Sequence, residues 1–160
     1  MIIVIMGVTG SGKTTIGRLL ASALDWSFAD GDDFHPAANI QKMSHGIPLD
    51  DDDRRPWLQA IRCWIEAALA RGESAVIACS ALKEAYRETL YVGSGVRFVY
   101  LAADAALVEQ RLRTRIGHFM NPTLIASQFA TLEEPAGTLK IDASLPPGEI
   151  VARITAAFAL

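Results

Sequence analysis

Short, uninterrupted apolar runs recur along the chain and predict buried strands. The first covers residues 2–6, Ile-Ile-Val-Ile-Met. Continuous β-branched runs of this length are typical of parallel strands that are covered on both faces. By the same reasoning we expect further strands at 26–29, 74–79, 96–101 and 138–141.

Between these runs, apolar residues recur at the spacing of a helix. In residues 14–24 the apolar positions are Ile16, Leu19, Leu20, Ala23 and Leu24, which share one helical face. Further helices are predicted at about 36–44, from an acidic turn at 50–53 to Gly72, and at 81–91, 104–116 and 149–158. Strands therefore alternate with helices, which predicts an α/β fold with a five-stranded parallel sheet sandwiched by helices.

One segment, residues 117–134, is polar and irregular, with room for one short helix. Connections of this length within a compact domain are usually lids or binding loops. The sequence has 160 residues and no internal repeat or linker. We therefore expect a single domain over residues 1–160, with a small lid at about 117–134.

Composition narrows the possible partners and the location of the chain. Apolar residues make up 51%, enough for a core, and the net charge of −3 gives no basic excess for nucleic-acid binding. Cys63 and Cys79 lack the spacing of a metal site, so both are expected to be reduced, buried thiols. The apolar start at residues 1–6 is too short for a signal peptide, and no run is long enough to cross a membrane. A cytoplasmic protein is expected.

A phosphate-binding loop follows the first predicted strand and precedes the first predicted helix. Residues 7–14 match G-x-x-x-x-G-K-[ST] completely. Its glycines allow the backbone to wrap around phosphate oxygens, while Lys13 reaches the β- and γ-phosphates and the Thr14 hydroxyl holds Mg²⁺. We therefore predict ATP and Mg²⁺ as cofactors. The predicted nucleotide-binding residues are Gly7, Val8, Thr9, Gly10, Ser11, Gly12, Lys13, Thr14 and Thr15.

This loop alone fixes a nucleotide and not a reaction. The chain lacks the N-K-x-D motif that specifies guanine, and it is short for a motor or transporter ATPase. A small kinase is the favoured interpretation, and a non-catalytic nucleotide-binding module is the competing one.

Two carboxylates, Asp30 and Asp32, end the second predicted strand. Ligands of parallel sheets bind at the carboxyl ends of the strands, so both should lie beside the phosphate loop. Either one could accept the proton of an attacking hydroxyl or hold Mg²⁺ through water. The third strand ends in Ser80 without the usual metal-binding Asp. We favour Asp32 as the base and Asp30 as a water-mediated metal ligand, but the sequence does not decide between them.

Several motifs then resemble one family along the whole chain. They are D-G-D-x-x-H-P at 30–36, N-x-x-K-M at 39–43, G-x-P-L-x-D-x-D-R-x-P-W-L at 46–58, C-S-A-L-K-x-x-Y-R at 79–87, R-x-G-H-F at 115–119 and S-Q-F-x-x-L-E at 127–133. The chain resembles the gluconate kinase (gluconokinase) family of P-loop carbohydrate kinases. This resemblance implies ATP-dependent phosphorylation of D-gluconate at its 6-hydroxyl, a fold similar to nucleoside-monophosphate and shikimate kinases, and a homodimer. A shikimate-like kinase, or one for another polyol or sugar acid, is the alternative.

Gluconate carries a carboxylate and a row of hydroxyls, so its site needs a cation and many hydrogen-bond partners. The predicted substrate-binding residues are Asp30, Asp32, His35, Asn39, Lys42, Arg54, Ser80, Lys83, Tyr86, Arg87 and, from the lid motif, His118. Other interpretations stay open. Instead of binding substrate, Arg54 could simply pair with the acidic turn at 50–53. His35 could likewise be just a residue at the entry of a helix. Trp57 and Trp64, seven residues apart, favour core packing.

Three arginines, Arg111, Arg113 and Arg115, crowd the end of the helix before the predicted lid. Arginines commonly stabilise the charge that develops during phosphoryl transfer. We expect Arg115 to contact the ATP phosphates in the closed state and to act in catalysis with Lys13 and Asp32. Arg111 is expected near the adenine, which residues 142–145 would also contact. The alternative is that basic residues simply favour a helix C-terminus. No role is predicted for Gln128.

Overall fold

Five strands form one parallel sheet, in the order β2-β3-β1-β4-β5. A computed structural model describes residues 1–114 and 122–160 of the chain. The strands are β1 (Ile2–Met6), β2 (Ser27–Asp30), β3 (Ala75–Ala78), β4 (Val96–Ala102) and β5 (Leu139–Asp142). β1 lies at the centre, where Ile2 is opposite Ala75 of β3 and Val96 of β4. The predicted α/β fold with a five-stranded parallel sheet is confirmed.

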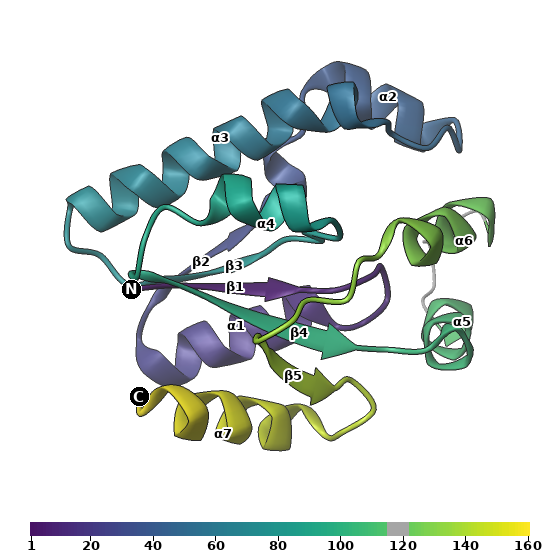
Figure 1. The fold of residues 1–160 in the computed structure, drawn as a ribbon. Coiled ribbons are helices and arrows are strands. Elements are labelled where there is room, and N and C mark those ends of the chain that lie inside the picture. Colours follow the sequence, from purple (N-terminus) through teal and green to yellow (C-terminus); the bar gives the residue numbers. More distant parts are fainter. Residues whose placement is uncertain (115–121) are drawn as a thin grey trace.

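Helices cover both faces of this sheet. They are α1 (Lys13–Leu24), the 3₁₀ helix η1 (Gly31–Phe34), α2 (Ala37–Ser44), α3 (Asp51–Ala70), α4 (Glu84–Leu90), α5 (Ala105–Thr114), α6 (Pro122–Thr131) and α7 (Pro147–Phe158). As Figure 1 shows, α3 and α4 lie on one face, and α1 and α7 lie on the other. α2, α5 and α6 gather toward the end of the sheet at which the strand arrows point. Ligands bind parallel sheets at that end.

The alternation of side chains along β1 explains its uninterrupted apolar run. Ile2, Val4 and Met6 pack into the core that includes α3, whereas Ile3 and Ile5 pack into the core that includes α1 and α7. All five residues of β1 are buried. A central parallel strand has no solvent side, so no polar residue is needed along it.

The acidic turn at residues 50–53 starts α3 through a capping box. The Asp50 side chain accepts a hydrogen bond of 2.8 Å from the Asp53 amide, and the Asp53 side chain accepts one of 3.0 Å from the Asp50 amide. Acidic side chains are favoured in this first turn because they face the positive end of the helix dipole. The acidic residues at 50–53 therefore stabilise the start of α3.

The two cysteines differ in exposure. Cys79 is buried after β3, but Cys63 is exposed on α3, so the prediction that both thiols are buried is wrong for Cys63. Residues 61 and 65 of α3 face the core, which turns position 63 outward. Burial raises the pKa of Cys79 to about 12, which keeps this thiol protonated near neutral pH.

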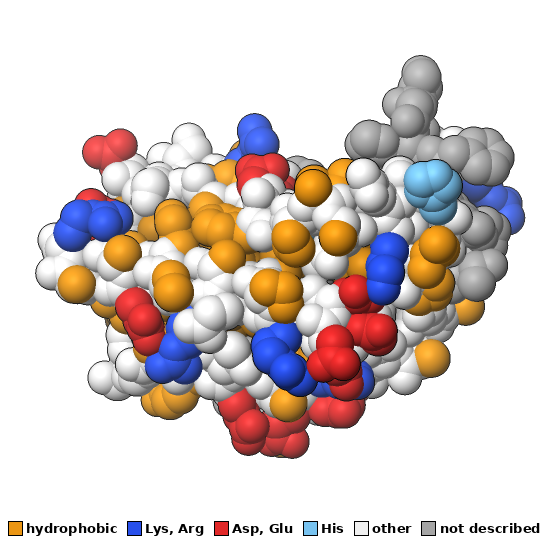
Figure 2. Space-filling view, turned by 90° about the horizontal axis from the view of Figure 1, so that it is seen from above, with side chains coloured by type: hydrophobic (Ala, Val, Ile, Leu, Met, Phe, Trp, Pro, Cys, Tyr) orange, Lys and Arg blue, Asp and Glu red, His pale blue; other side chains and the backbone are white. Residues whose placement is uncertain are grey.

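The face that carries α3 mixes charges of both signs. Basic and acidic side chains lie next to one another in Figure 2, and the ion pairs Arg55–Asp52 and Arg62–Glu66 belong to α3.

Over residues 1–114 and 122–160, no helix is both long and apolar enough to cross a membrane.

The segment predicted to be irregular contains the helix α6. Its residues Ile125 and Phe129 pack on a small apolar cluster formed by Val8, Leu82 and Val108. This cluster joins the phosphate loop to α5 and α6. Arg115 and His118, for which we predicted roles, lie outside the described residues.

Candidate active site

The phosphate loop bends sharply between β1 and α1 because of its glycines. Gly7 has φ 144°, and a Cβ atom there would lie 2.7 Å from the backbone oxygen of Leu101. Gly12 has φ 100° and caps α1 in a left-handed conformation that favours glycine. The loop therefore ends at a helix N-terminus, where backbone N–H groups and the helix dipole favour an anion. Lys13, the first residue of α1, has its Nζ 3.0 Å from the backbone oxygen of Val8.

Asp30 and Asp32 point to different partners. The Thr14 hydroxyl donates a hydrogen bond of 2.9 Å to Oδ2 of Asp30, and Oδ1 of Asp30 accepts one of 3.1 Å from the Asp32 amide. Asp30 is thus held against the first turn of α1. The Asp32 side chain instead lines a pocket beside the phosphate loop.

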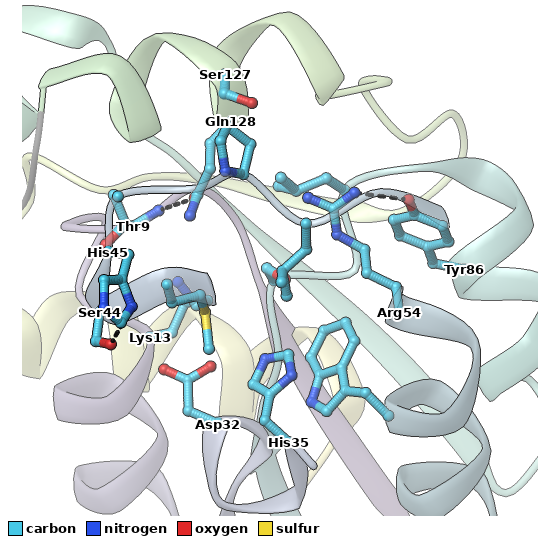
Figure 3. A pocket seen from close by; sticks show the side chains of 17 residues that line it. Thr9, Lys13, Asp32, His35, Ser44, His45, Arg54, Tyr86, Ser127 and Gln128 are labelled. Carbon is cyan, nitrogen blue, oxygen red and sulfur yellow. Dashed lines mark hydrogen bonds between the residues drawn. The ribbon is translucent and has the colours of Figure 1, made fainter. Parts of the chain in front are cut away.

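This pocket has a volume of about 480 Å³, and we call it the acceptor pocket. It is built from the phosphate loop, η1, the end of α2 and the segment after it, α3, the segment after β3, α4 and α6. Figure 3 shows Asp32, His35 and Lys13 at one side, Arg54 and Tyr86 at another, and Gln128 of α6 above them. The lining residues are Thr9, Lys13, Asp32, His35, Met43, Ser44, His45, Gly46, Pro48, Leu49, Arg54, Trp57, Ser80, Leu82, Tyr86, Ser127 and Gln128.

Trp57 supports the side of the pocket that carries Asp32. Its indole nitrogen donates a buried hydrogen bond of 2.7 Å to the backbone oxygen of Gly31, and its ring stacks on His35 with centroids 4.5 Å apart. Burial lowers the pKa of His35, an effect that Asp32 opposes and Arg54 reinforces. The prediction that Trp57 packs in the core is confirmed, since the side chain is 1% exposed. It also lines the pocket.

Arg54 is held by a polar cluster at the other side of the pocket. Its Nη1 donates a hydrogen bond of 3.2 Å to the Tyr86 hydroxyl, which in turn donates to Asp51. Lys83 pairs with the same carboxylate at 2.8 Å. Hydrogen bonds from Lys83 and Tyr86 lower the pKa of Asp51, which stays ionised near neutral pH. A guanidinium fixed in this way presents N–H donors to the pocket, where a carboxylate can bind.

A second pocket of about 260 Å³ lies on another side of the phosphate loop. Arg111 joins its walls: the guanidinium donates to the backbone oxygens of Ser11 at 2.8 Å and Ala143 at 2.5 Å. The lining residues are Gly10, Ser11, Gly12, Thr15, Ile16, Arg111, Thr114, Ala143, Leu145, Pro147 and Ile150. The structure thus brings together Arg111, Ala143 and Leu145, and their contact with the adenine stays a prediction.

Gln128 links α6 to the phosphate loop. Its Oε1 accepts a hydrogen bond of 2.7 Å from the backbone N–H of Thr9, and both residues line the acceptor pocket. After α6, the side chain of Glu133 accepts a hydrogen bond of 2.7 Å from the backbone N–H of Glu84. The sequence predicted no role for Gln128, although its position in the lid motif marked it as a candidate.

The structure brings part of the predicted acceptor site together. Asp32, His35, Arg54, Ser80 and Tyr86 line the same pocket. Part of the segment 43–49 also lines it, including Met43, Gly46, Pro48 and Leu49, which belong to two of the family motifs but had been assigned no role themselves.

Besides Asp30, which is hydrogen-bonded to Thr14, four predicted substrate-binding residues lie outside this lining. Asn39 donates to the backbone oxygen of Asp53, and Lys42 pairs with the Asp53 carboxylate at 2.7 Å. Lys83 pairs with Asp51, and Arg87 donates to the backbone oxygens of residues 81 and 82. Each has a protein partner in this structure, and direct contact of these four residues with substrate stays a prediction.

A parallel sheet, a phosphate loop and two flanking pockets define a P-loop kinase, and the family model described as shikimate kinase matches residues 9–134. The chain is 47% identical to a probable gluconokinase of Xenopus tropicalis, over 85% of this chain and 80% of that one. It is 42% identical to the thermoresistant gluconokinase of Escherichia coli, over 94% and 89%. Within the P-loop kinases, the chain belongs to the gluconokinase family.

A solved structure supports this assignment. The gluconokinase of Sinorhizobium meliloti superimposes with a TM-score of 0.88 at 44% identity, and the match covers 98% of this chain and 90% of that one. The family and fold that the sequence motifs indicated are therefore confirmed.

Proposed function

We propose that this protein transfers the γ-phosphoryl group of ATP to the 6-hydroxyl of D-gluconate, giving 6-phospho-D-gluconate and ADP. The acceptor pocket carries this proposal, because it has a fixed guanidinium on one side and a carboxylate beside the phosphate loop on another. A linear sugar acid has matching ends, a carboxylate and a terminal hydroxyl. The gluconokinase names of the relatives support the same substrate.

On the donor side, ATP would bind with its phosphates on the N-terminus of α1 and its adenine in the pocket of Arg111. The Thr14 hydroxyl and the Asp30 carboxylate, 2.9 Å apart, are oxygen donors that suit Mg²⁺. Mg²⁺ would neutralise phosphate charge there. Lys13 would stabilise the charge that develops on the transferring group.

On the acceptor side, Asp32 would accept the proton of the attacking hydroxyl. Arg54 would bind the gluconate carboxylate, with its orientation held by Tyr86 and Asp51. Ser80 lines the same pocket and would hydrogen-bond to a hydroxyl of the chain. Asp32 would thus recognise the terminal hydroxyl of the substrate, and Arg54 would recognise its carboxylate.

We expect residues 1–160 to act as one kinase domain in the cytoplasm, as a homodimer, with a lid that contains α6. Arg115 and His118 keep their predicted roles in that lid, at the phosphates and the substrate respectively.

A coupled assay of ADP release tests the proposed reaction. It would compare gluconate, other sugar acids, shikimate, nucleoside monophosphates and no acceptor, each with ATP and Mg²⁺. Gluconate should give the highest kcat/KM. Faster turnover of shikimate or a nucleoside monophosphate would refute the assignment of the acceptor. ATP binding without ADP release for any acceptor would support a nucleotide-binding module instead.

A further inference from the structure

The buried amide of Asn39 contacts His35 in a way that fixes which ring nitrogen carries hydrogen. Asn39 is 2% exposed, and its Nδ2 lies 2.8 Å from the backbone oxygen of Asp53. A carbonyl oxygen only accepts hydrogen bonds, so the side-chain atom facing it must be the amide nitrogen and not the amide oxygen. The orientation of the amide group is therefore determined by the backbone of α3.

The same Nδ2 atom lies 3.2 Å from Nδ1 of His35. An amide nitrogen only donates, so Nδ1 must be the accepting nitrogen and carry no hydrogen. A neutral imidazole with a bare Nδ1 has its hydrogen on Nε2. A protonated imidazolium would set two donors against each other, and burial independently disfavours the charged ring.

Trp57 fixes the plane of this ring. The two rings are stacked at an interplanar angle of 10°, which restricts rotation of His35 about its side-chain bonds. Nδ1 is engaged with Asn39, while His35 lines the acceptor pocket together with Asp32 and Arg54. The ring edge that carries Nε2 is thus the one available to a ligand.

We propose that Asn39 is a positioning residue that holds His35 in the neutral tautomer with hydrogen on Nε2, so that His35 donates a hydrogen bond to a hydroxyl oxygen of the acceptor. The substrate part of this inference rests on the proposed function, whereas the tautomer does not. The charged groups that influence this ring are Asp32 and Arg54, on η1 and α3. Asn39, predicted to touch substrate, acts here through His35.

His45 offers an internal comparison within the same pocket. Its Nδ1 lies 2.7 Å from the backbone oxygen of Gln41, and this acceptor requires a hydrogen on Nδ1. His35 is thus assigned an Nδ1 without hydrogen and His45 an Nδ1 with hydrogen, although both residues line the same pocket. The chain has 3 His residues, so their ring signals can be assigned by substitution.

Long-range ¹H–¹⁵N NMR of the full chain at neutral pH tests the tautomer directly. The His35→Gln and His45→Gln variants assign the signals. We expect His35 to show a protonated Nε2 and an unprotonated Nδ1, with His45 protonated at Nδ1. A protonated Nδ1 in His35 would overturn the proposal. The measurement needs no substrate, so the tautomer of His35 can be determined even if gluconate is not the acceptor. A failure of the proposed function would appear in the ADP-release assay instead.

Kinetics of Asn39→Asp test the consequence for the acceptor. A carboxylate accepts a hydrogen, so at a pH above the pKa of His35, where the ring is neutral, its hydrogen moves to Nδ1 and Nε2 is left as an acceptor. We expect kcat/KM for gluconate to fall about 10- to 100-fold, as for a mismatched buried hydrogen bond, with little change in the KM for ATP. Gln41→Glu, on α2 and outside the pocket lining, adds the same charge and should not reproduce the loss. An equal loss in both variants would contradict the inference.

A second pair of variants keeps the test decisive if Asn39→Asp unfolds. His35→Gln places an amide N–H near the position of Nε2, whereas His35→Phe keeps a stacking ring without a donor. We expect His35→Gln to retain more kcat/KM for gluconate than His35→Phe. Wild-type kcat/KM in His35→Phe would exclude a hydrogen bond from His35 to the acceptor.

Discussion

The hydroxyl of Thr14 donates a hydrogen bond of 2.9 Å to the carboxylate of Asp30, which joins the first turn of α1 to the end of β2. This contact separates the environments of two carboxylates that the sequence could not distinguish. Asp30 is held against the first turn of α1, while Asp32 lines the acceptor pocket. The division suggests that one carboxylate serves the nucleotide and the other serves the acceptor.

Asp32→Asn should lower kcat strongly while leaving the KM for ATP near its wild-type value. A general base contributes about 10²- to 10⁴-fold to rate, so we expect a loss of at least about 100-fold. Steady-state kinetics with gluconate and ATP measure both parameters. Asp33→Asn is the matched control, because Asp33 is a neighbouring exposed carboxylate outside the pocket lining. Normal turnover of Asp32→Asn would show that Asp32 is not the base.

Asp30→Asn should instead change the dependence on Mg²⁺. The substitution removes the negative charge beside Thr14, so we expect half-maximal activity to need about 10-fold more Mg²⁺, the equivalent of roughly 1.4 kcal/mol. Titration of activity with Mg²⁺ at fixed ATP measures this shift. The same Mg²⁺ dependence in Asp30→Asn and the wild type would remove Asp30 from the metal site.

Arg54→Ala should weaken gluconate selectively. Loss of a charge-assisted hydrogen bond costs about 1.5–3 kcal/mol, which corresponds to a fall in kcat/KM of roughly 10- to 150-fold. D-glucitol, a polyol of similar length without the carboxylate, provides the control substrate. Arg54→Ala should have little effect on any turnover of D-glucitol. Equal losses for the two substrates would mean that Arg54 does not recognise the carboxylate.

Gly31→Ala should destabilise the turn that carries Asp32. A Cβ atom at Gly31 would lie 2.6 Å from the backbone oxygen of Ala78, and Gly31 also accepts the Trp57 hydrogen bond. Overpacking of this kind costs about 1–3 kcal/mol in the free energy of unfolding. Denaturant unfolding measures it.

The control for that substitution is Gly148→Ala in α7, where an added Cβ meets nothing within 4 Å. Alanine favours helix over glycine, so Gly148→Ala should leave stability unchanged or raise it by up to about 1 kcal/mol. If Gly31→Ala proved as stable as Gly148→Ala, the close packing of the start of η1 against β3 would not constrain this turn.

Much of the fold could be predicted because its signals are local. The apolar run of β1, the glycines of the phosphate loop and the acidic start of α3 each follow from residues adjacent in sequence. Asp32, His35 and Arg54 were also predicted to bind one acceptor, because they fall in motifs of one family. The structure places these three around one pocket.

The roles of Lys83 and Asn39 could not be predicted in the same way. Lys83 was predicted to contact substrate, but Asp51 reaches it from α3. Asn39 was predicted to contact substrate, yet its nitrogen faces a backbone oxygen and His35. Both partners come from tertiary contacts that the local pattern does not contain.

Identification of the reaction product tests the central claim most directly. The protein would be incubated with gluconate, ATP and Mg²⁺, and the product examined by ³¹P NMR with coupling to the sugar protons. We predict a phosphate monoester whose phosphorus couples to the two protons on C6, with one ADP formed for each ester. Phosphate attached to another carbon, or ADP released without a gluconate ester, would contradict the proposed function.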